Sequence, residues 1–226
     1  MKIELHSHTS EGSACALISG QELALDYVQH HMDVLVVTNH YSKHIYERFK
    51  GNLKENYLKG YLEAKMIGEQ YHMTVLLGME LNLASHPNDY LIYGIDEDFI
   101  CRHPKIFNES LEEAARIVHQ EQGVIYQAHP MRQPCELTGA EILDGYEFNQ
   151  SRFHENHNEK LKIWIHENIE KYPHLHFTCG SDCHGHEGCA AGVLEVSKDV
   201  FDNQSLKEAL KMIDYPYLEK TEFFHL

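Results

Sequence analysis

Short apolar runs alternate with amphipathic stretches of helical period along the whole chain. Residues 2–8 and 33–40 are runs of strand length, and residues 18–32 between them carry apolar side chains at helical spacing, with Ser19 as a suitable N-cap. This alternation predicts parallel strands joined by crossover helices. No repeat, low-complexity tract or linker interrupts it, so we expect a single α/β domain over residues 1–226.

The later segments continue the pattern. We expect further helices over 52–72, 108–123, 156–172 and 204–213, and further strands within 73–82, 90–95, 124–130, 145–150 and 176–184. The helix that begins after Asn108 or Ser110 has Gly123 where a glycine just past the helix end is expected.

The composition excludes some classes of function. Asp and Glu number 35 against 19 Lys and Arg, which gives a formal charge of −16 that repels nucleic-acid backbones and anionic membranes. No apolar segment approaches the roughly 18 residues of a membrane span, and the first residues form no apolar signal region. We therefore expect a cytoplasmic protein with no membrane partner and no stable nucleic-acid complex, and six cysteines that are reduced thiols. The sequence leaves the oligomeric state open.

Residue types that bind metal ions stand at the ends of the expected strands. The chain has 19 histidines, and His is the most common metal ligand in proteins. His6 and His8 are two residues apart, so in a strand their imidazoles lie on the same face. Similar residues end the other strands: His40, Glu80, His129, Asp182 and His184. Because the C-terminal ends of parallel barrel strands share one face, we expect these side chains to meet there.

Five short motifs, in this order, resemble those of the PHP family, the polymerase and histidinol phosphatase superfamily of metal-dependent phosphoesterases. They are HSH at 6–8, VVTNH at 36–40, GME at 78–80, AHP at 128–130 and GSDCH at 180–184. The resemblance covers most of the chain and implies a distorted (β/α)7 TIM-like barrel. It also implies two or three divalent ions, zinc, manganese or iron, at the C-terminal mouth, and hydrolysis of a phosphoester by a metal-activated water.

The resemblance also implies the ligands of three ions. His6, His8, Glu80 and Asp182 would hold one ion, Glu80 would bridge to a second ion held also by His129, and His40 and His184 would hold a third. Two further ligands are open: Glu11 is the candidate for the third ion, and His86, Asp89 and His103 compete for the second. The family usually has aspartate before the second-motif histidine, where this chain has Asn39, and an amide adds no charge beside His40. We therefore expect weaker binding at the third position.

Arg132 follows the AHP motif and is suited to bind a phosphate with two guanidinium nitrogens, although a solvated surface arginine fits the same position. We predict Glu80, Asp182 and Arg132 as catalytic residues, with Arg132 also binding substrate. Glu147 and Asn149, at the end of the sixth strand, either orient ligands or line the rim.

The leading hypothesis is a phosphoesterase that acts on a small phosphorylated metabolite or a short nucleotide, because the chain shows no long insertion to bind a large partner. A second hypothesis is a PHP-type protein-tyrosine phosphatase. A third is a catalytically inactive metal-binding domain that serves as a sensor or interaction module.

Overall fold

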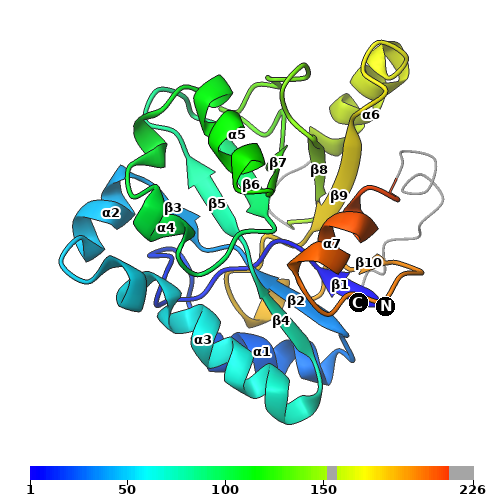
Figure 1. Cartoon of the computed structure of the whole chain (residues 1–226). Helices are drawn as coiled ribbons and strands as arrows, with labels where there is room; N and C mark the ends of the chain where they lie inside the picture. The colour runs from blue at the N-terminus through cyan, green and yellow to red at the C-terminus, as the bar shows by residue number, and fades with distance from the viewer. Residues whose placement is uncertain (152–156, 214–226) are drawn as a thin grey trace.

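The computed structural model describes residues 1–151 and 157–213, and places the strands at the centre with the helices around them (Figure 1). The strands are β1 (Lys2–Glu4), β2 (Val34–Val37), β3 (His40–Tyr41), β4 (Thr74–Leu77), β5 (Met79–Asn82), β6 (Asp89–Tyr93), β7 (Val124–Gln127), β8 (Gly145–Asn149), β9 (His176–Gly180) and β10 (Leu194–Glu195). The helices are α1 (Gly20–Gln29), α2 (Lys43–Phe49), α3 (Leu53–Tyr71), α4 (Phe99–Arg102), α5 (Leu111–Gln120), α6 (His157–Asn168) and α7 (Asn203–Leu210), with short 3-10 turns at Ile106–Asn108 and His186–Gly188.

The strands form two sheets, with the orders β10-β1-β2-β4 and β3-β5-β6-β7-β8-β9. The chain passes from the first sheet to the second twice, between β2 and β3 and between β4 and β5, where Gly78 leaves no room for a side chain against Thr38. β6 runs antiparallel to both of its neighbours, so the expectation of parallel strands throughout was wrong. The connection between β5 and β6 is too short to hold the crossover that a parallel pair requires.

The two sheets also meet beyond the end of β1. The His8 N–H donates to the Cys183 carbonyl at 2.9 Å, and the Cys183 N–H donates to the His6 carbonyl at 3.2 Å. The segment after β1 therefore lies beside the segment after β9. The predicted (β/α)7 barrel is confirmed in part: the fold is α/β with parallel strand pairs, but its strands belong to two sheets.

Local sequence signals account for the helix ends. Ser19 and Glu22 form a capping box at the start of α1, and Ser110 caps α5 as expected. The prediction for the end of α5 was off by one residue: Gln122 takes the left-handed conformation, with φ of 61°, and Gly123 follows it, packed closely against Val118.

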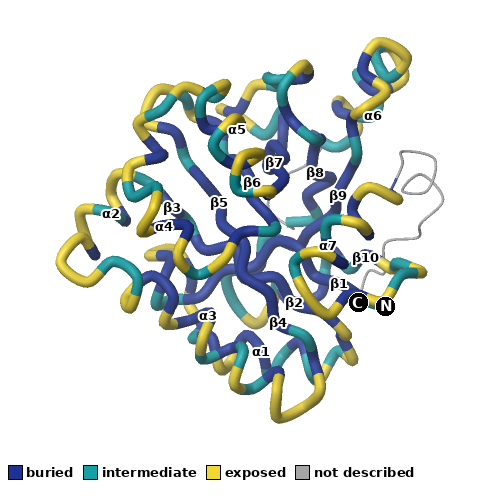
Figure 2. Tube along the Cα trace, viewed as in Figure 1, coloured by how far each residue is buried: buried dark blue, intermediate teal, exposed yellow. Residues whose placement is uncertain are grey.

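The strands are buried and the outer faces of the helices are exposed (Figure 2). All four residues of β2 are buried, as the apolar run predicts. The centre also holds buried polar side chains, among them Glu4, His6, His8, Glu80 and Glu147. None of the helices in the described ranges is both long enough and apolar enough to cross a membrane.

Candidate metal centre

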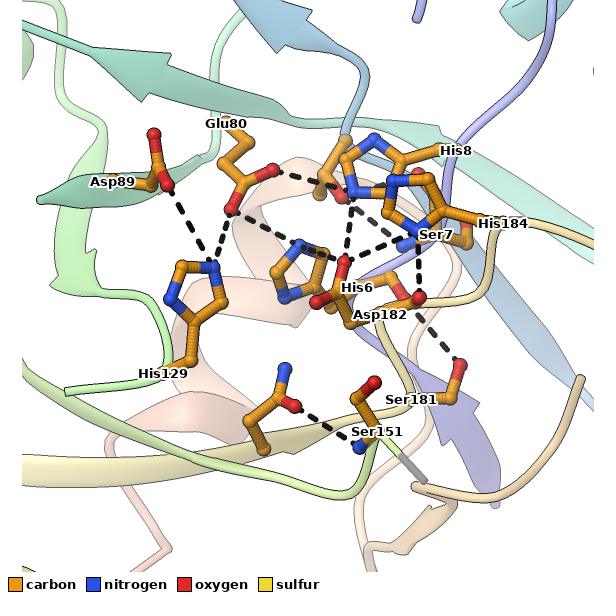
Figure 3. A network of polar contacts seen from close by, with 12 residues as sticks. His6, Ser7, His8, Glu80, Asp89, His129, Ser151, Ser181, Asp182 and His184 are labelled. Carbon is orange, nitrogen blue, oxygen red and sulfur yellow. Dashed lines mark hydrogen bonds and ion pairs between the residues drawn. The ribbon is translucent and has the colours of Figure 1, made fainter. Parts of the chain in front are cut away.

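Strand register brings the residues of the five motifs to one place. β3 pairs with β5 so that His40 stands directly beside Glu80, and β5 pairs with β6 so that Asp89 lies opposite Asn82. The hydrogen bonds between the segments after β1 and β9 set His6 and His8 against Asp182. Figure 3 shows the result: side chains from segments far apart in the sequence converge, among them His6, His8, Glu80, Asp89, His129, Asp182 and His184.

Of the three candidate groups in the described part of the chain, the largest consists of His6, His8, Glu80 and Asp182, which are all buried and offer ligand atoms within 4.8 Å of one another. The Nε2 atoms of His6 and His8 lie 3.3 to 3.4 Å from oxygens of Glu80 and Asp182. Those two nitrogens are fully buried and make no hydrogen bond within residues 1–151 and 157–213. Two ligand atoms on one zinc ion in tetrahedral geometry are about 3.4 Å apart. The donor set and its spacing therefore fit a divalent ion, as the PHP resemblance implies.

Hydrogen bonds on the outer side of the rings aim these nitrogens inward. His6 donates from Nδ1 to Glu147 Oε1 at 2.7 Å, and His8 lies with Nδ1 3.1 Å from Ser13 Oγ. Because the Ser13 hydroxyl donates to Asn39 Oδ1, it accepts the Nδ1 proton of His8. In the neutral form of both rings, which is the form that binds a metal ion, Nε2 is then the atom with the free lone pair.

Asn39 acts on the loop that follows His8. Its Oδ1 accepts the backbone N–H of Thr9 at 2.8 Å, and its Nδ2 donates to the Thr9 hydroxyl at 3.0 Å. An aspartate at this position has no hydrogen to donate. The amide therefore fixes residues 9–13 as well as the Ser13 hydroxyl, while the expected effect on ion affinity stays a prediction.

His129 and Asp89 lie on the other side of Glu80. His129 Nε2 is 2.9 Å from Glu80 Oε1 and 3.9 Å from Asp89 Oδ2, and a second candidate group joins His40, Glu80 and Asp89. Of the three competitors for this position, the structure brings Asp89 to the cluster. His103 instead contacts Glu121 at 2.9 Å, and His86 accepts the Asn88 N–H, so neither reaches it.

A third group joins His8, His40 and His184, with their rings 4.3 to 5.9 Å apart. The expectation that Glu11 completes this group is not met. Its carboxylate accepts the Gly20 N–H at 3.2 Å, at the N-terminus of α1, where the helix dipole favours a negative charge. Cys15 lies beside this group, with its Sγ 3.1 Å from His184 Nε2. The only signal for Cys15 in the sequence is that a cysteine, which is a soft metal ligand, stands seven residues after His8.

Arg132 lies at the edge of the cluster. Its Nη1 donates to Asp182 Oδ2 at 2.8 Å, and its Nη2 lies 2.8 Å from His129 Nε2. The side chain is mostly buried, so it belongs to the site and not to the solvated surface.

Burial and the neighbouring charges shift the pKa values strongly. Burial lowers the pKa of His6, but the carboxylates of Glu147 and Glu80 outweigh it and hold that pKa well above its usual value. The pKa of His129 is raised to about 9, because contacts with Cys135 and Glu80 outweigh burial. Burial and the charge of His40 lower the pKa of His8 to about 4, so its ring is neutral.

Burial and neighbouring charges also shift the pKa values of the acidic groups, some downward and some upward. Burial opposes ionisation of Glu80, yet His40 and His6 hold its pKa well below the usual range. Burial and the charge of Glu80 raise the pKa of Asp89 to about 6. Partial burial raises the pKa of the Cys15 thiol, but hydrogen bonds with His184 and His40 outweigh it and bring that pKa to about 6.

Two of the predicted ligands have left-handed backbone conformations. The φ angle is 30° at His129 and 53° at Asp182. Such a conformation costs a residue with a side chain about 1 to 3 kcal/mol, and it is found mainly where function requires it.

Sequence reasoning missed Glu4. Its carboxylate accepts the N–H groups of His6 and Ser181, both at 2.9 Å, and the hydroxyl of Tyr27 at 2.9 Å, so it ties the segments after β1 and β9 together. A signal was present, because residues 4, 6 and 8 of a strand lie on the same face. Glu147, by contrast, orients His6 from behind, which was one of its two expected roles.

A cavity of about 750 Å³ opens beside the cluster. Arg132, Asp182, His184 and His40 line it, together with apolar or small residues such as Leu17 and Ala191. The site is therefore accessible to a molecule of metabolite size.

Comparisons with known proteins support the fold. No protein-family model matches the chain, and no curated protein matches it in sequence. A two-domain protein from Bacteroides vulgatus that contains a predicted PHP-like metal-dependent phosphoesterase superimposes with a TM-score of 0.66 at 14% identity, covering 93% of this chain and 62% of that one. The lesion-specific endonuclease EndoQ of Pyrococcus furiosus gives 0.64 at 11% identity, over 95% of this chain and 56% of that one.

An amidohydrolase from Chromobacterium violaceum, with bound sulfate and no metal, gives a TM-score of 0.57 at 13% identity, over 92% of this chain and 95% of that one. This chain spans less than two thirds of the length of the Bacteroides and Pyrococcus proteins. At these identities the likeness concerns the fold, which hosts more than one reaction. The resemblance drawn from the five motifs is confirmed at that level: the chain has the fold of the PHP-like phosphoesterases.

Proposed function

We propose that this protein is a metal-dependent hydrolase of phosphoesters that acts on a small phosphorylated metabolite or a short nucleotide. The observation that carries the proposal is the buried group of His6, His8, Glu80 and Asp182, whose ligand atoms all lie within 4.8 Å of one another. Ion binding explains why two fully buried imidazole nitrogens face carboxylates without a hydrogen bond to any described residue.

Divalent ions held there, which we expect to be zinc, manganese or iron, would supply an activated water and offset negative charge on the phosphate oxygens. The chain's own residues have three tasks. Glu147 and Ser13 fix the rings of His6 and His8 so that Nε2 faces the centre. Glu80 lies between the groups and contacts His40 and His129 on its two oxygens, which suits a bridging carboxylate. Arg132 presents a guanidinium at the edge of the cavity, where it would bind phosphate oxygens.

The shape of the cavity supports a substrate of modest size. Its volume of about 750 Å³ is in the range of small-molecule sites. Arg132 is its only strongly basic side chain among the described residues that line it, which favours a substrate with one phosphoryl group at the centre. The apolar lining residues, such as Leu17 and Ala191, would contact the alcohol part of the ester.

The test combines metal content with turnover. The protein is stripped with a chelator, reloaded with zinc, manganese or iron(II), and assayed with p-nitrophenyl phosphate, bis-p-nitrophenyl phosphate and a panel of phosphorylated metabolites and oligonucleotides. We expect two or three bound ions per chain and hydrolysis of phosphate esters. Glu80→Ala should lose both ions that it contacts as well as activity, while Glu69→Ala, an exposed carboxylate in α3, should keep them.

Other outcomes separate the alternatives. Hydrolysis restricted to phosphotyrosine peptides would favour a protein-tyrosine phosphatase, and cleavage of amides but not of esters would favour an amidohydrolase. If the protein binds metal but hydrolyses no ester under any metal supplement, the catalytically inactive metal-binding domain would be the remaining hypothesis. Unchanged metal content in Glu80→Ala would refute the assignment of the centre itself.

A further inference from the structure

The loop after the HSH motif holds a thiol against the third group of imidazoles. Cys15 Sγ lies 3.1 Å from His184 Nε2, and both residues line the cavity together with His40. Hydrogen bonds fix the loop on both sides of the thiol: the Leu17 N–H donates to the His184 carbonyl at 2.7 Å, and the Ser10 N–H donates to the Ile18 carbonyl at 2.8 Å. The backbone therefore holds Cys15 at this position.

The His184 ring turns one nitrogen towards the thiol. His184 Nδ1 is 2.8 Å from the Asp182 carbonyl, which can only accept, so Nδ1 carries a proton and Nε2, which faces Cys15, is the nitrogen left to bind an ion. A second observation is independent of the cysteine: His8, His40 and His184 form a group in which each ring offers a nitrogen within 4.8 Å of the others. Such a group of imidazoles is suited to bind a cation.

Charge balance calls for an anionic ligand in this group. Neutral imidazoles do not offset the two positive charges of a divalent ion, and ligands of such ions bind in their deprotonated form. Glu11 points to the N-terminus of α1, and Glu80 and Asp182 already belong to the group with His6 and His8. Cys15 is placed to supply the missing negative charge as a thiolate.

We infer that Cys15 is a ligand of the ion held by His40 and His184, and that it makes this position prefer zinc, iron(II) or cobalt(II) over manganese or magnesium. The inference rests on the proposed metal-dependent function. On binding, the S–H bond breaks, its proton passes to solvent, and a sulfur–metal bond forms. Zinc at its usual distances holds sulfur and nitrogen about 3.6 Å apart, so the observed 3.1 Å requires only a small shift of an exposed side chain. Thiolate is a soft ligand, which gives the preference among metals.

The experiment uses the full chain, stripped of metal and titrated with cobalt(II). A thiolate on cobalt gives a charge-transfer band in the near ultraviolet, which neither imidazole nor carboxylate produces. We expect the wild type to show this band. Cys15→Ala should lose the band and should bind one ion fewer per chain. The matched control is Cys101→Ala, because Cys101 is the other exposed cysteine and lies at α4, so this variant should keep both the band and the ion. Glu11→Gln should also keep them, and Cys15→Asp should restore the ion without the band and bind manganese better than the wild type does.

A second measurement does not depend on cobalt. Zinc should slow the alkylation of Cys15 by iodoacetamide, followed by mass spectrometry, and should leave the rate at Cys101 unchanged. An unchanged band and stoichiometry in Cys15→Ala, or equal alkylation rates with and without zinc, would overturn the inference. The proposed function fails separately, if the wild type shows the band and binds its ions yet hydrolyses no phosphate ester.

Discussion

Glu147 offers a sharp test of how the centre is organised, because it contacts two predicted ligands without being one. Its Oε1 accepts from His6 Nδ1 at 2.7 Å, and its Oε2 accepts the backbone N–H of His129 at 2.9 Å. Both side chains of the His6–Glu147 pair are fully buried. We therefore consider Glu147→Gln, which keeps the size of the side chain and removes its charge.

Two effects follow from this geometry, and different measurements detect them. A hydrogen bond to a charged group contributes about 1.5 to 3 kcal/mol, and a neutral one about half as much, so His6 loses about 1 to 1.5 kcal/mol of support as a ligand. That loss corresponds to roughly a tenfold weaker metal Kd. In addition, glutamine can present oxygen to only one of the two donors, and an amide nitrogen that faces the His129 N–H costs about 1 to 3 kcal/mol of stability.

Metal affinity is measured by competition with a chromophoric chelator, and stability by urea unfolding of the metal-free protein. Glu4→Gln serves as the control, because Glu4 is equally buried but contacts backbone N–H groups and Tyr27, and no ligand side chain. Glu4→Gln should lower stability and leave the Kd nearly unchanged. A Kd for Glu147→Gln within about twofold of the wild type, less than the tenfold worked out above, would refute the view that Glu147 supports His6 as a ligand.

Three further predictions concern substrate binding, pH and helix capping. Arg132→Ala should raise KM for a phosphate monoester by roughly ten- to a hundredfold, because a charged hydrogen bond to the substrate is lost. The metal content should stay unchanged, and steady-state kinetics combined with metal analysis measures both. An unaltered kcat/KM would contradict the role of Arg132 in substrate binding. His129, whose pKa is about 9 in the metal-free protein, is protonated at pH 7 and contributes stability that is full below about pH 6.5 and lost as the pH rises through 9. A metal ion must displace that proton, so metal affinity should rise with pH up to about 9. Calorimetry in buffers of different ionisation enthalpy should show that protons are released on metal binding at pH 7. The absence of proton release would contradict the role of His129 as a ligand. Ser19→Ala removes the capping box of α1 and should cost about 1 kcal/mol, a fall in Tm of about 2 to 4 °C, and an unchanged Tm would contradict the cap's importance.

Local patterns in the sequence were sufficient for most elements and for the residues that meet at the centre. His40 and Glu80 could be placed because each follows an apolar run, and the register of β3 on β5 then puts them side by side. The direction of β6 was not predicted, because its apolar pattern is the same in a parallel and an antiparallel strand.

The ligands from loops were less predictable, because a loop's path depends on contacts far away in the sequence. Glu11 and Cys15 belong to one loop, and the bonds that hold this loop, such as those from Asn39 and to His184, determine which of them faces the imidazoles. His103 has the imidazole that the PHP resemblance favours at this position, but it follows α4 and contacts Glu121 instead. Asp89, at the start of β6, lies near Glu80. Sequence spacing contains none of these distances.

The left-handed backbone at His129 and Asp182 has a consequence for anyone who modifies this protein. Glycine or asparagine would adopt those angles at lower cost, so selection for thermal stability in the absence of metal should favour their appearance at these two positions. Such a screen would give a more robust fold by removing ligands from the centre. Libraries built on this scaffold should therefore be selected with metal present, so that ion binding repays the strain at both positions.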